Sequence, residues 1–329
     1  MPKLARNAQV TKPGCVTRFV VTLVFFLLWL SPSRLRLSLS RALAPGLLAC
    51  RGKRRHIIQT NLRYCFPGRS SQEREQLALA YAQCWAFSVL DMGRLWFTSP
   101  AGLGRYIRVE GNEYLENAMA SGRPVLLLAP HTVGLEHAAL CLATRYPMLG
   151  LTREDGGDLG SWILQRLRAR RADLVFDRTT PMRKVITAIR SGRALYYLPD
   201  EDHDGRRRCV FVPYFGRKVS TLLGSGRLIA LCDAQLLPCM TRLDTATGVY
   251  TVTIEKPLAV EKLSPEATCA LIRQELERMI RAAPENYLWN LKMFQSLEQG
   301  GRNPDYAWCA SKTEQSGLLA RLKWRKRSA

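Results

Sequence analysis

The stretch Val125-Leu-Leu-Leu-Ala-Pro-His131-Thr-Val-Gly-Leu-Glu136 decides how the central part of this 329-residue chain is expected to fold. Its four consecutive aliphatic residues follow the turn signal at residues 121–124 and predict a short strand covered on both faces. Such strands belong to sheets that helices flank, so the expected fold class is α/β with a mixed, largely parallel central sheet. The strand ends at Pro130, which places His131 where open α/β sheets bind their ligands.

The spacing of His131 and Glu136 indicates a base with an acid beside it. A neutral imidazole accepts a proton near pH 7, and a carboxylate on its far nitrogen fixes the tautomer and stabilises the imidazolium. The five-residue offset does not match helical pairing, so we expect His131 in a turn and Glu136 in the first turn of a helix, with Gly134 easing the bend. A strand-end histidine satisfied by backbone groups is the alternative.

Further elements follow this stretch in a definite order. Residues 174–178 predict a strand ending in Arg178, and residues 196–203 predict another ending in acids. A helix near residues 221–232 precedes a strand pair that begins at residue 236 and continues at residues 249–257. This order resembles the glycerolipid acyltransferase superfamily, which has an HxxxxD/E motif, a strand ending in arginine, a Pro-Asp/Glu turn and a proline-bearing strand.

Segments outside those blocks carry a narrower resemblance. They are Arg54-Arg-His-Ile-Ile-Gln-Thr-Asn-Leu-Arg-Tyr-Cys-Phe-Pro67, Tyr196-Tyr-Leu-Pro-Asp-Glu-Asp-His203, Cys209-Val-Phe-Val-Pro-Tyr-Phe215, Gly226-Arg-Leu228 and Pro284-Glu-Asn-Tyr-Leu-Trp289. Together they resemble the lipid A late acyltransferases of Gram-negative envelopes, the lauroyl- and myristoyl-transferase type, over residues 50–296. Relatives commonly have a Gly-Pro turn after Asp202-His203, whereas this chain has Asp-Gly-Arg-Arg-Arg at residues 204–208. The sequence therefore does not identify the head group of the acceptor.

The resemblance implies transfer of an acyl chain from acyl carrier protein to a hydroxyl of an anionic lipid A precursor. His131 would deprotonate the hydroxyl, Glu136 would orient His131, and the alkoxide would attack the thioester. It also implies a place at the bacterial inner membrane, with the catalytic domain on the cytoplasmic face. An acceptor that is another glycolipid, a lysophospholipid or an amino-acid lipid is the first alternative. A non-catalytic membrane-binding relative is the second, and water as acceptor would make the chain a thioesterase.

Four further residues are candidates for binding substrate. Arg178 matches the strand-end arginine of the superfamily and would hold a phosphate, or alternatively pair with Asp177 or Asp200. Asp200 would bind sugar or order Arg178. Arg170 and Arg171 would contact phosphate, although a solvated helix face explains either one alone. We expect no cofactor and no metal, since no Cys or His cluster has ligand spacing.

The positive charge lies mainly at the two ends of the chain. The formal net charge is +22, residues 1–72 hold thirteen Lys and Arg and no acid, and residues 318–329 hold five more. Such ends suit an anionic membrane surface, where each Lys or Arg contributes roughly 1 kcal/mol. Apolar segments beside the charges, and the lack of a recognisable nucleic-acid module, argue against nucleic acid as partner.

These patterns divide the chain into three parts. Residues 1–50 form a basic segment with a hydrophobic membrane anchor at about 16–31, whose apolar run of twelve residues is short for a span of ~20. It would span with snorkelling arginines, lie at the interface, or be a cleaved signal. Residues 51–298 form the catalytic domain, and residues 299–329 form a linker and a basic amphipathic tail.

The remaining helix signals belong to the catalytic domain. A capping box at Ser70 and Glu73 predicts a long helix toward residue 97. Residues 266–282 predict an amphipathic helix, and residues 284–294 predict a shorter one begun by proline.

Overall fold

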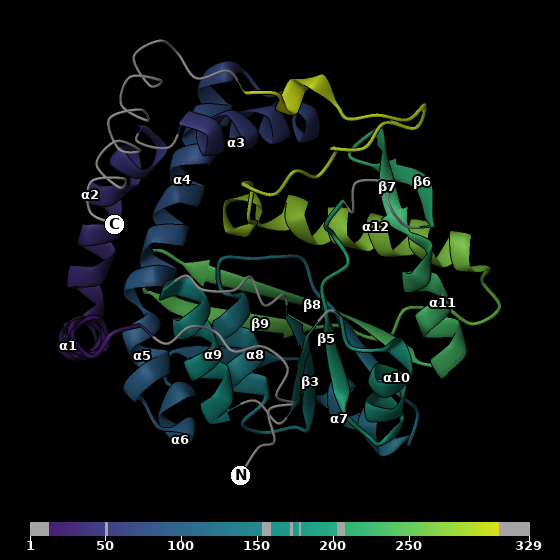
Figure 1. The fold of residues 1–329 in the computed structure, drawn as a ribbon, viewed down its shortest axis with the longest axis horizontal. Helices are drawn as coiled ribbons and strands as arrows, with labels where there is room; N and C mark the ends of the chain where they lie inside the picture. Colours follow the sequence, from purple (N-terminus) through teal and green to yellow (C-terminus); the bar gives the residue numbers. More distant parts are fainter. Residues whose placement is uncertain are drawn as a thin grey trace.

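The protein folds around a mixed seven-stranded sheet with helices on its two sides (Figure 1). This computed structural model describes residues 13–49, 52–152, 159–171, 174–177, 179–202 and 208–308, apart from the side chains of residues 169–171. In sheet order the strands are β1 (Ile107–Glu110), β9 (Val249–Ile254), β8 (Gln235–Asp244), β2 (Val125–Leu128), β5 (Ala194–Tyr197), β3 (Met148–Thr152) and β4 (Leu174–Asp177). The five strands from β8 to β4 are parallel, and β9 runs antiparallel to β8. The predicted α/β class is confirmed.

The helices between residues 112 and 282 connect and cover these strands. They are α7 (Asn112–Ala120), α8 (Leu135–Leu142), α9 (Leu159–Arg171), α10 (Met182–Arg190), α11 (Leu223–Cys232) and α12 (Pro265–Ala282). A separate hairpin of β6 (Cys209–Tyr214) and β7 (Arg217–Leu222) packs on α12. All four residues of β2 are buried, which agrees with the strand predicted from their aliphatic run.

The long helix predicted from the capping box is interrupted once. α4 (Ser71–Leu90) starts with that box, in which Ser70 and Glu73 exchange backbone and side-chain hydrogen bonds. It ends at Asp91, and α5 (Met92–Phe97) and α6 (Pro100–Leu103) continue the chain. The interruption places the Asp91 carboxylate in the protein interior, where it is 1% exposed.

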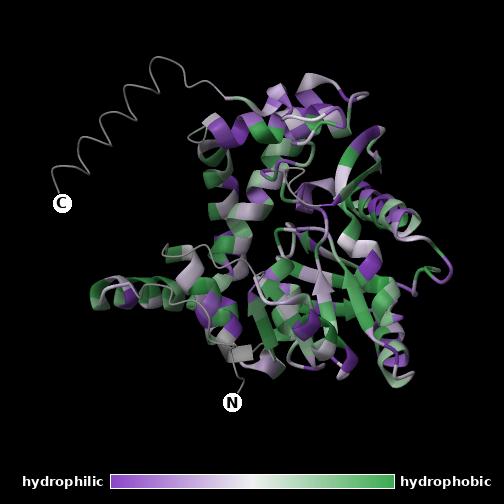
Figure 2. Cartoon of the chain, turned by 45° about the vertical axis from the view of Figure 1, so that its right-hand side comes forward, coloured by the Kyte–Doolittle hydropathy of each residue, from purple (hydrophilic) through white to green (hydrophobic). Residues whose placement is uncertain are grey.

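The N-terminal hydrophobic segment forms a bent pair of helices. α1 (Cys15–Leu30) and α2 (Ser33–Ala49) meet at 117°, and together they have the length and composition of a membrane span. Among the described residues no single helix meets both requirements. α1 packs on α5, with the Phe25 and Trp96 rings 5.4 Å apart, while its outward side exposes Val16, Phe19 and Leu27. Figure 2 shows this apolar helix projecting from the body.

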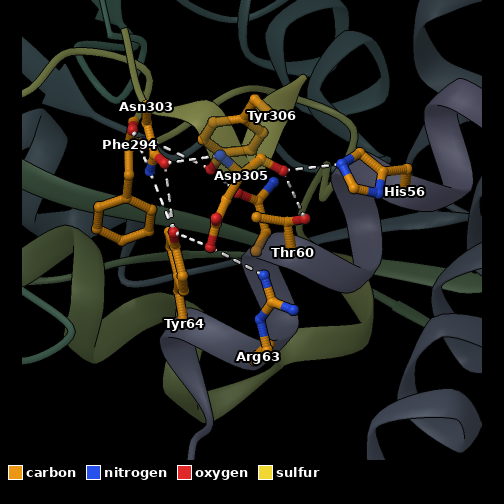
Figure 3. A network of polar contacts seen from close by, with 9 residues as sticks. His56, Thr60, Arg63, Tyr64, Phe294, Asn303, Asp305 and Tyr306 are labelled. Atoms are coloured by element: carbon orange, nitrogen blue, oxygen red, sulfur yellow. Dashed lines mark hydrogen bonds and ion pairs between the residues drawn. The ribbon is translucent and has the colours of Figure 1, made fainter. Parts of the chain in front are cut away.

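Residues 303–306 are tied to α3 (Gly52–Cys65) by polar contacts (Figure 3). The Asp305 carboxylate accepts hydrogen bonds from Tyr64 at 2.6 Å and from Arg63 at 3.0 Å, and its carbonyl contacts His56 at 2.8 Å. Asn303 bonds Tyr64 and the carbonyl of Phe294. This part of the predicted linker therefore packs against α3, and the tail beyond residue 308 lies outside the described residues.

Candidate active site

His131 and Asp200 lie at the carboxyl ends of two neighbouring strands. His131 comes three residues after the end of β2, and Asp200 comes three residues after the end of β5. The two strands pair in parallel, with Leu128 opposite Tyr197, so both segments leave the sheet at the same edge. The topology thus brings together two residues that are 69 positions apart in the sequence.

The Asp200 carboxylate holds His131 at two points. A hydrogen bond joins Oδ1 to the ring nitrogen Nδ1, and Oδ2 accepts the backbone N–H of His131 at 2.9 Å. Asp200 is fully buried, while 14% of the His131 side chain is exposed. Burial acts to raise the pKa of Asp200, but the charge and hydrogen bonds of His131 and the charge of Arg273 outweigh it and lower the pKa to about 2. An ionised carboxylate on Nδ1 leaves Nε2 as the nitrogen that can accept a proton.

Two further residues fix Asp200. The Tyr287 hydroxyl donates to Oδ2 at 2.9 Å, and the Arg273 guanidinium donates to the backbone carbonyl of Asp200 at 3.0 Å. Burial and the charge of Asp200 raise the pKa of Tyr287 well above its ordinary value, so the phenol stays protonated and remains a donor. Arg273 is itself buried and also donates to the Thr221 hydroxyl at 2.9 Å. Sequence reasoning missed both residues.

The backbone around Tyr287 also holds the loop that carries His131. The N–H of Val133 donates to the carbonyl of Asn286 at 2.8 Å, and the N–H of Leu288 donates to the carbonyl of His131 at 2.9 Å. The helix predicted for residues 284–294 is therefore wrong beyond its first turn, since only Pro284–Asn286 forms a 3-10 helix. Its extended continuation pairs with the loop that carries His131, which a helix would not allow because its backbone groups bond internally.

Glu136 lies in the first turn of α8, as predicted, but it pairs with an arginine. Arg168 on α9 donates through Nε to one carboxylate oxygen at 3.1 Å and through Nη2 to the other. Glu136 was predicted to orient His131. In the structure Asp200, and not Glu136, is bonded to Nδ1 of His131. The reason is the sheet order, which puts the end of β5 beside the end of β2.

Gly134 is required by packing rather than by its dihedral angles. Its φ is −95°, so the backbone angle at this bend does not itself require glycine. A Cβ at this position would lie 2.8 Å from Cγ2 of Thr241 and 2.9 Å from the Tyr250 ring. A side chain there would push the loop that carries His131 away from β8 and β9.

An apolar pocket of about 290 Å³ opens beside His131. Its walls come from the ends of β3 and β5 and from the facing sides of α10 and α11. They include Leu151, Val185, Ile186, Tyr197, Leu198, Leu228 and Leu231. The polar groups at the pocket are few, which is the usual composition of a site for an apolar ligand. Glu201 lies at the His131 end, with its Oε1 3.6 Å from Nε2.

Comparison with known proteins assigns the chain to a family. The family described as bacterial lipid A biosynthesis acyltransferase matches residues 4–296. The chain belongs to this family. It is 30% identical to a lipid A biosynthesis acyltransferase of Haemophilus influenzae over 84% of this chain and 87% of that protein. It is 29% identical to the lipid A biosynthesis lauroyltransferase of Escherichia coli, over 78% and 84%, and 27% identical to the myristoyltransferase of the same organism, over 79% and 80%.

Membership makes the chain an O-acyltransferase of lipid A biosynthesis. Contacts of Asn61 show what the motif at residues 54–67 does in the fold. Asn61 is fully buried and donates to the carbonyls of Trp289 and Leu291 at 2.7 and 2.6 Å. Helix α3 thereby holds the segment that supports His131 and Asp200. In this acyltransferase the motif therefore supports the candidate active site, although it lies far from it in the sequence.

The other predicted substrate-binding residues are only partly placed. Arg170 and Arg171 lie on α9, which also carries Arg168, but their side chains lie outside the described residues, as does Arg178. Asp200 was predicted to bind sugar or order Arg178. In the structure its carboxylate is hydrogen-bonded to His131. Among the described residues no group of His, Cys, Asp and Glu has the arrangement of a metal site.

Proposed function

We propose that this acyltransferase moves a fatty acyl chain from acyl carrier protein to a hydroxyl of a lipid A precursor, with His131 as general base. One observation carries the proposal: a buried, ionised Asp200 holds Nδ1 of a partly exposed histidine at the wall of an apolar pocket. The apolar walls of the pocket can bind the acyl chain, and the histidine can accept a proton from the hydroxyl. The acceptor class follows from the family, and the carrier protein as donor is part of the proposal.

The reaction needs one proton acceptor and no protein nucleophile. Nε2 of His131 takes the proton as the acceptor hydroxyl attacks the thioester carbonyl, and Asp200 stabilises the imidazolium that forms. Collapse of the tetrahedral intermediate breaks the carbon–sulfur bond. The imidazolium then returns its proton to the leaving thiolate, which frees the carrier thiol and restores the neutral base.

The proposal separates the roles of the two acids. Asp200 orients His131 through the hydrogen bond at Nδ1. Glu136 anchors Arg168, which also donates to the Thr152 hydroxyl at the end of β3. That pair joins α8 to α9, the helix on which Arg170 and Arg171 are the candidate contacts for acceptor phosphate, together with Arg178.

The apolar pocket is proposed to take the donor acyl chain. Its wall residues Leu228 and Leu231 on α11 and Val185 on α10 lie away from the sheet edge and would meet the distal methylenes. Each methylene buried there contributes about 0.8 kcal/mol. Named relatives use lauroyl and myristoyl groups, so small changes in these walls are enough to alter chain preference.

Helix α1 is proposed to lie in the membrane interface at the cytoplasmic face of the inner membrane. Its outward residues Phe19, Leu27 and Leu30 are 68%, 57% and 60% exposed, and Trp29 is placed to reach the head groups. The basic N-terminal residues add attraction to anionic lipids. An enzyme held this way has its catalytic region in water and its acceptor within reach in the bilayer.

Mass spectrometry of lipid A tests the proposal directly. The host is a Gram-negative strain lacking its late acyltransferases, and it expresses the wild type, His131→Ala or the control His56→Ala. We expect a new secondary acyl chain with the wild type and the control, and none with His131→Ala. Unchanged lipid A in a host that holds folded, membrane-bound wild type would overturn the lipid A acceptor. Transfer by His131→Ala would overturn the base.

A further inference from the structure

The two helices that frame the apolar pocket, α10 and α11, have basic outer surfaces. α10 carries Arg183, Lys184 and Arg190, α11 carries Arg227, and neither helix contains an acidic residue. All four cations are exposed, and within the described part of the chain none of them pairs with a carboxylate. The faces of these helices that line the pocket are mostly apolar, and Ser225 and Arg227 are their polar members. A ligand that suits this place has a long apolar chain and a negatively charged body.

The rim of the pocket also exposes large apolar side chains. Met182 at the start of α10 is 52% exposed, and Leu231 near the end of α11 is 63% exposed, although both line the pocket. Arg190 donates to the carbonyl of Leu231 at 2.7 Å and so ties the two helices together at that end. Apolar side chains surrounded by unpaired cations are a common composition of an interface with an acidic protein.

The position of the rim decides between a protein and a membrane as the partner. Figure 1 places α1, with its exposed apolar side chains, and the pair α10–α11 at opposite sides of the molecule. A molecule that rests on a bilayer through α1 turns α10 and α11 toward water. The partner at this rim is therefore a soluble acidic protein rather than a lipid surface.

We propose that the outer faces of α10 and α11 form the docking surface for the acyl carrier protein that delivers the donor chain. This inference rests on the proposed function, because it takes a carrier protein as donor. The chain enters the pocket between the two helices, and its thioester reaches His131 at the inner end. Arg183, Lys184 and Arg227 attract the acidic carrier and set its orientation, while Met182 and Leu231 make the apolar contact.

Charge reversal on this rim provides the test. Arg183→Glu with Lys184→Glu is compared with the matched double reversal Arg105→Glu with Arg108→Glu, two exposed cations before and on β1 at the opposite edge of the sheet. Transfer is measured in detergent with two donors, acyl carrier protein and acyl-pantetheine, which bears the same thioester without the protein. We expect the KM for the carrier donor to rise about 10-fold or more in the rim variant alone. The kcat and the KM for acyl-pantetheine stay at wild-type values.

The outcomes separate this inference from the proposed function. An unchanged KM for the carrier donor in the rim variant overturns the docking surface and leaves the reaction intact. Equal losses in the rim and control variants also overturn it, since the effect is then one of net charge. Loss of binding to vesicles containing anionic lipid, with an unchanged KM, shows that the rim meets the membrane. A wild type that uses acyl-pantetheine but not the carrier donor contradicts the donor itself.

Discussion

Two histidines lie beside buried aspartates in this molecule, and they differ in what surrounds the pair. His131 meets Asp200 at the wall of a pocket, and 14% of its side chain is exposed. His137 lies six residues later, with Nε2 3.4 Å from Oδ2 of Asp91, and it is 3% exposed. Its ring stacks on Tyr250 at a centroid distance of 4.1 Å. The contacts also differ in kind: Asp200 is hydrogen-bonded to Nδ1 of His131, whereas neither ring nitrogen of His137 has a hydrogen-bond partner among the described residues.

The difference lies in charge balance and access. Asp91 is also 3.1 Å from Nε of Arg36 and 3.3 Å from Nε of Arg94, so two buried cations neutralise its carboxylate. This cluster joins the α1–α2 pair to α5 and α8. The carboxylate of Asp200, by contrast, accepts hydrogen bonds from neutral donors and one imidazole, while the nearby Arg273 binds its backbone carbonyl, and that imidazole lies at the apolar pocket. One buried carboxylate thus holds the proposed base just before α8, and the other anchors the N-terminal helices against the first turn of the same helix.

Replacing the two histidines gives the largest contrast. His131→Ala should lower transfer by about 10³-fold or more, because the base is removed, with little change in thermal midpoint. His137→Ala should lower the unfolding free energy by about 2 kcal/mol, because a stacked buried ring is removed, with transfer retained in the folded fraction. Thermal melts and transfer assays on both variants measure this. Loss of transfer in fully folded His137→Ala would contradict the assignment.

Asp91→Asn should cost about 3 kcal/mol of stability, because Arg36 and Arg94 would remain buried without a counter-charge. Urea unfolding followed by circular dichroism measures the change. A variant as stable as wild type would show that the cluster does not hold the N-terminal helices.

Acid should weaken the fold through Asp200. Its pKa falls from the ordinary 3.8 to about 2 on folding, so its contribution is complete above about pH 4 and is lost as the pH falls from about 4 to 2. The loss amounts to about 2 kcal/mol. Unfolding free energies between pH 5 and pH 2 should therefore fall more steeply in wild type than in Asp200→Asn. Parallel pH curves would contradict the lowered pKa.

Tyr287→Phe should have the smallest of these effects. Removing the hydroxyl deletes one donor to Asp200 and should lower kcat about 10-fold with KM nearly unchanged. Tyr214→Phe is the matched control, because its buried hydroxyl has no hydrogen-bond partner among the described residues. Equal kcat values for the two variants would exclude a positioning role for Tyr287.

The sequence predicts the local parts of this site well. The aliphatic run before His131 predicts β2, and the five-residue offset predicts Glu136 in the first turn of a helix. Local pattern does not show which strands become neighbours, so it does not pair His131 with Asp200. Two predicted strands ending in His131 and in acids were nevertheless a usable signal, because parallel neighbours share one edge.

The remaining partners follow from segments whose conformation is set by tertiary contacts. Proline at residue 284 predicts a helix, but the segment after Asn286 instead pairs with the loop that carries His131. The predicted helix gave no reason to place Tyr287 beside Asp200. Arg168 was not predicted as a site residue, since four arginines on one helix give no indication of which one pairs with Glu136. Contacts of this kind depend on the packing of α8 against α9.

The central claim is that Asp200, and not Glu136, supports the base. The most direct measurement is the kcat for transfer to lipid A precursor by Asp200→Asn and Glu136→Gln, assayed side by side at equal folded concentrations. We predict a loss of about 10³-fold for Asp200→Asn, because the imidazole loses its tautomer and its counter-charge, and a loss of about 10-fold for Glu136→Gln. The reverse order would contradict the account and return the orienting role to Glu136.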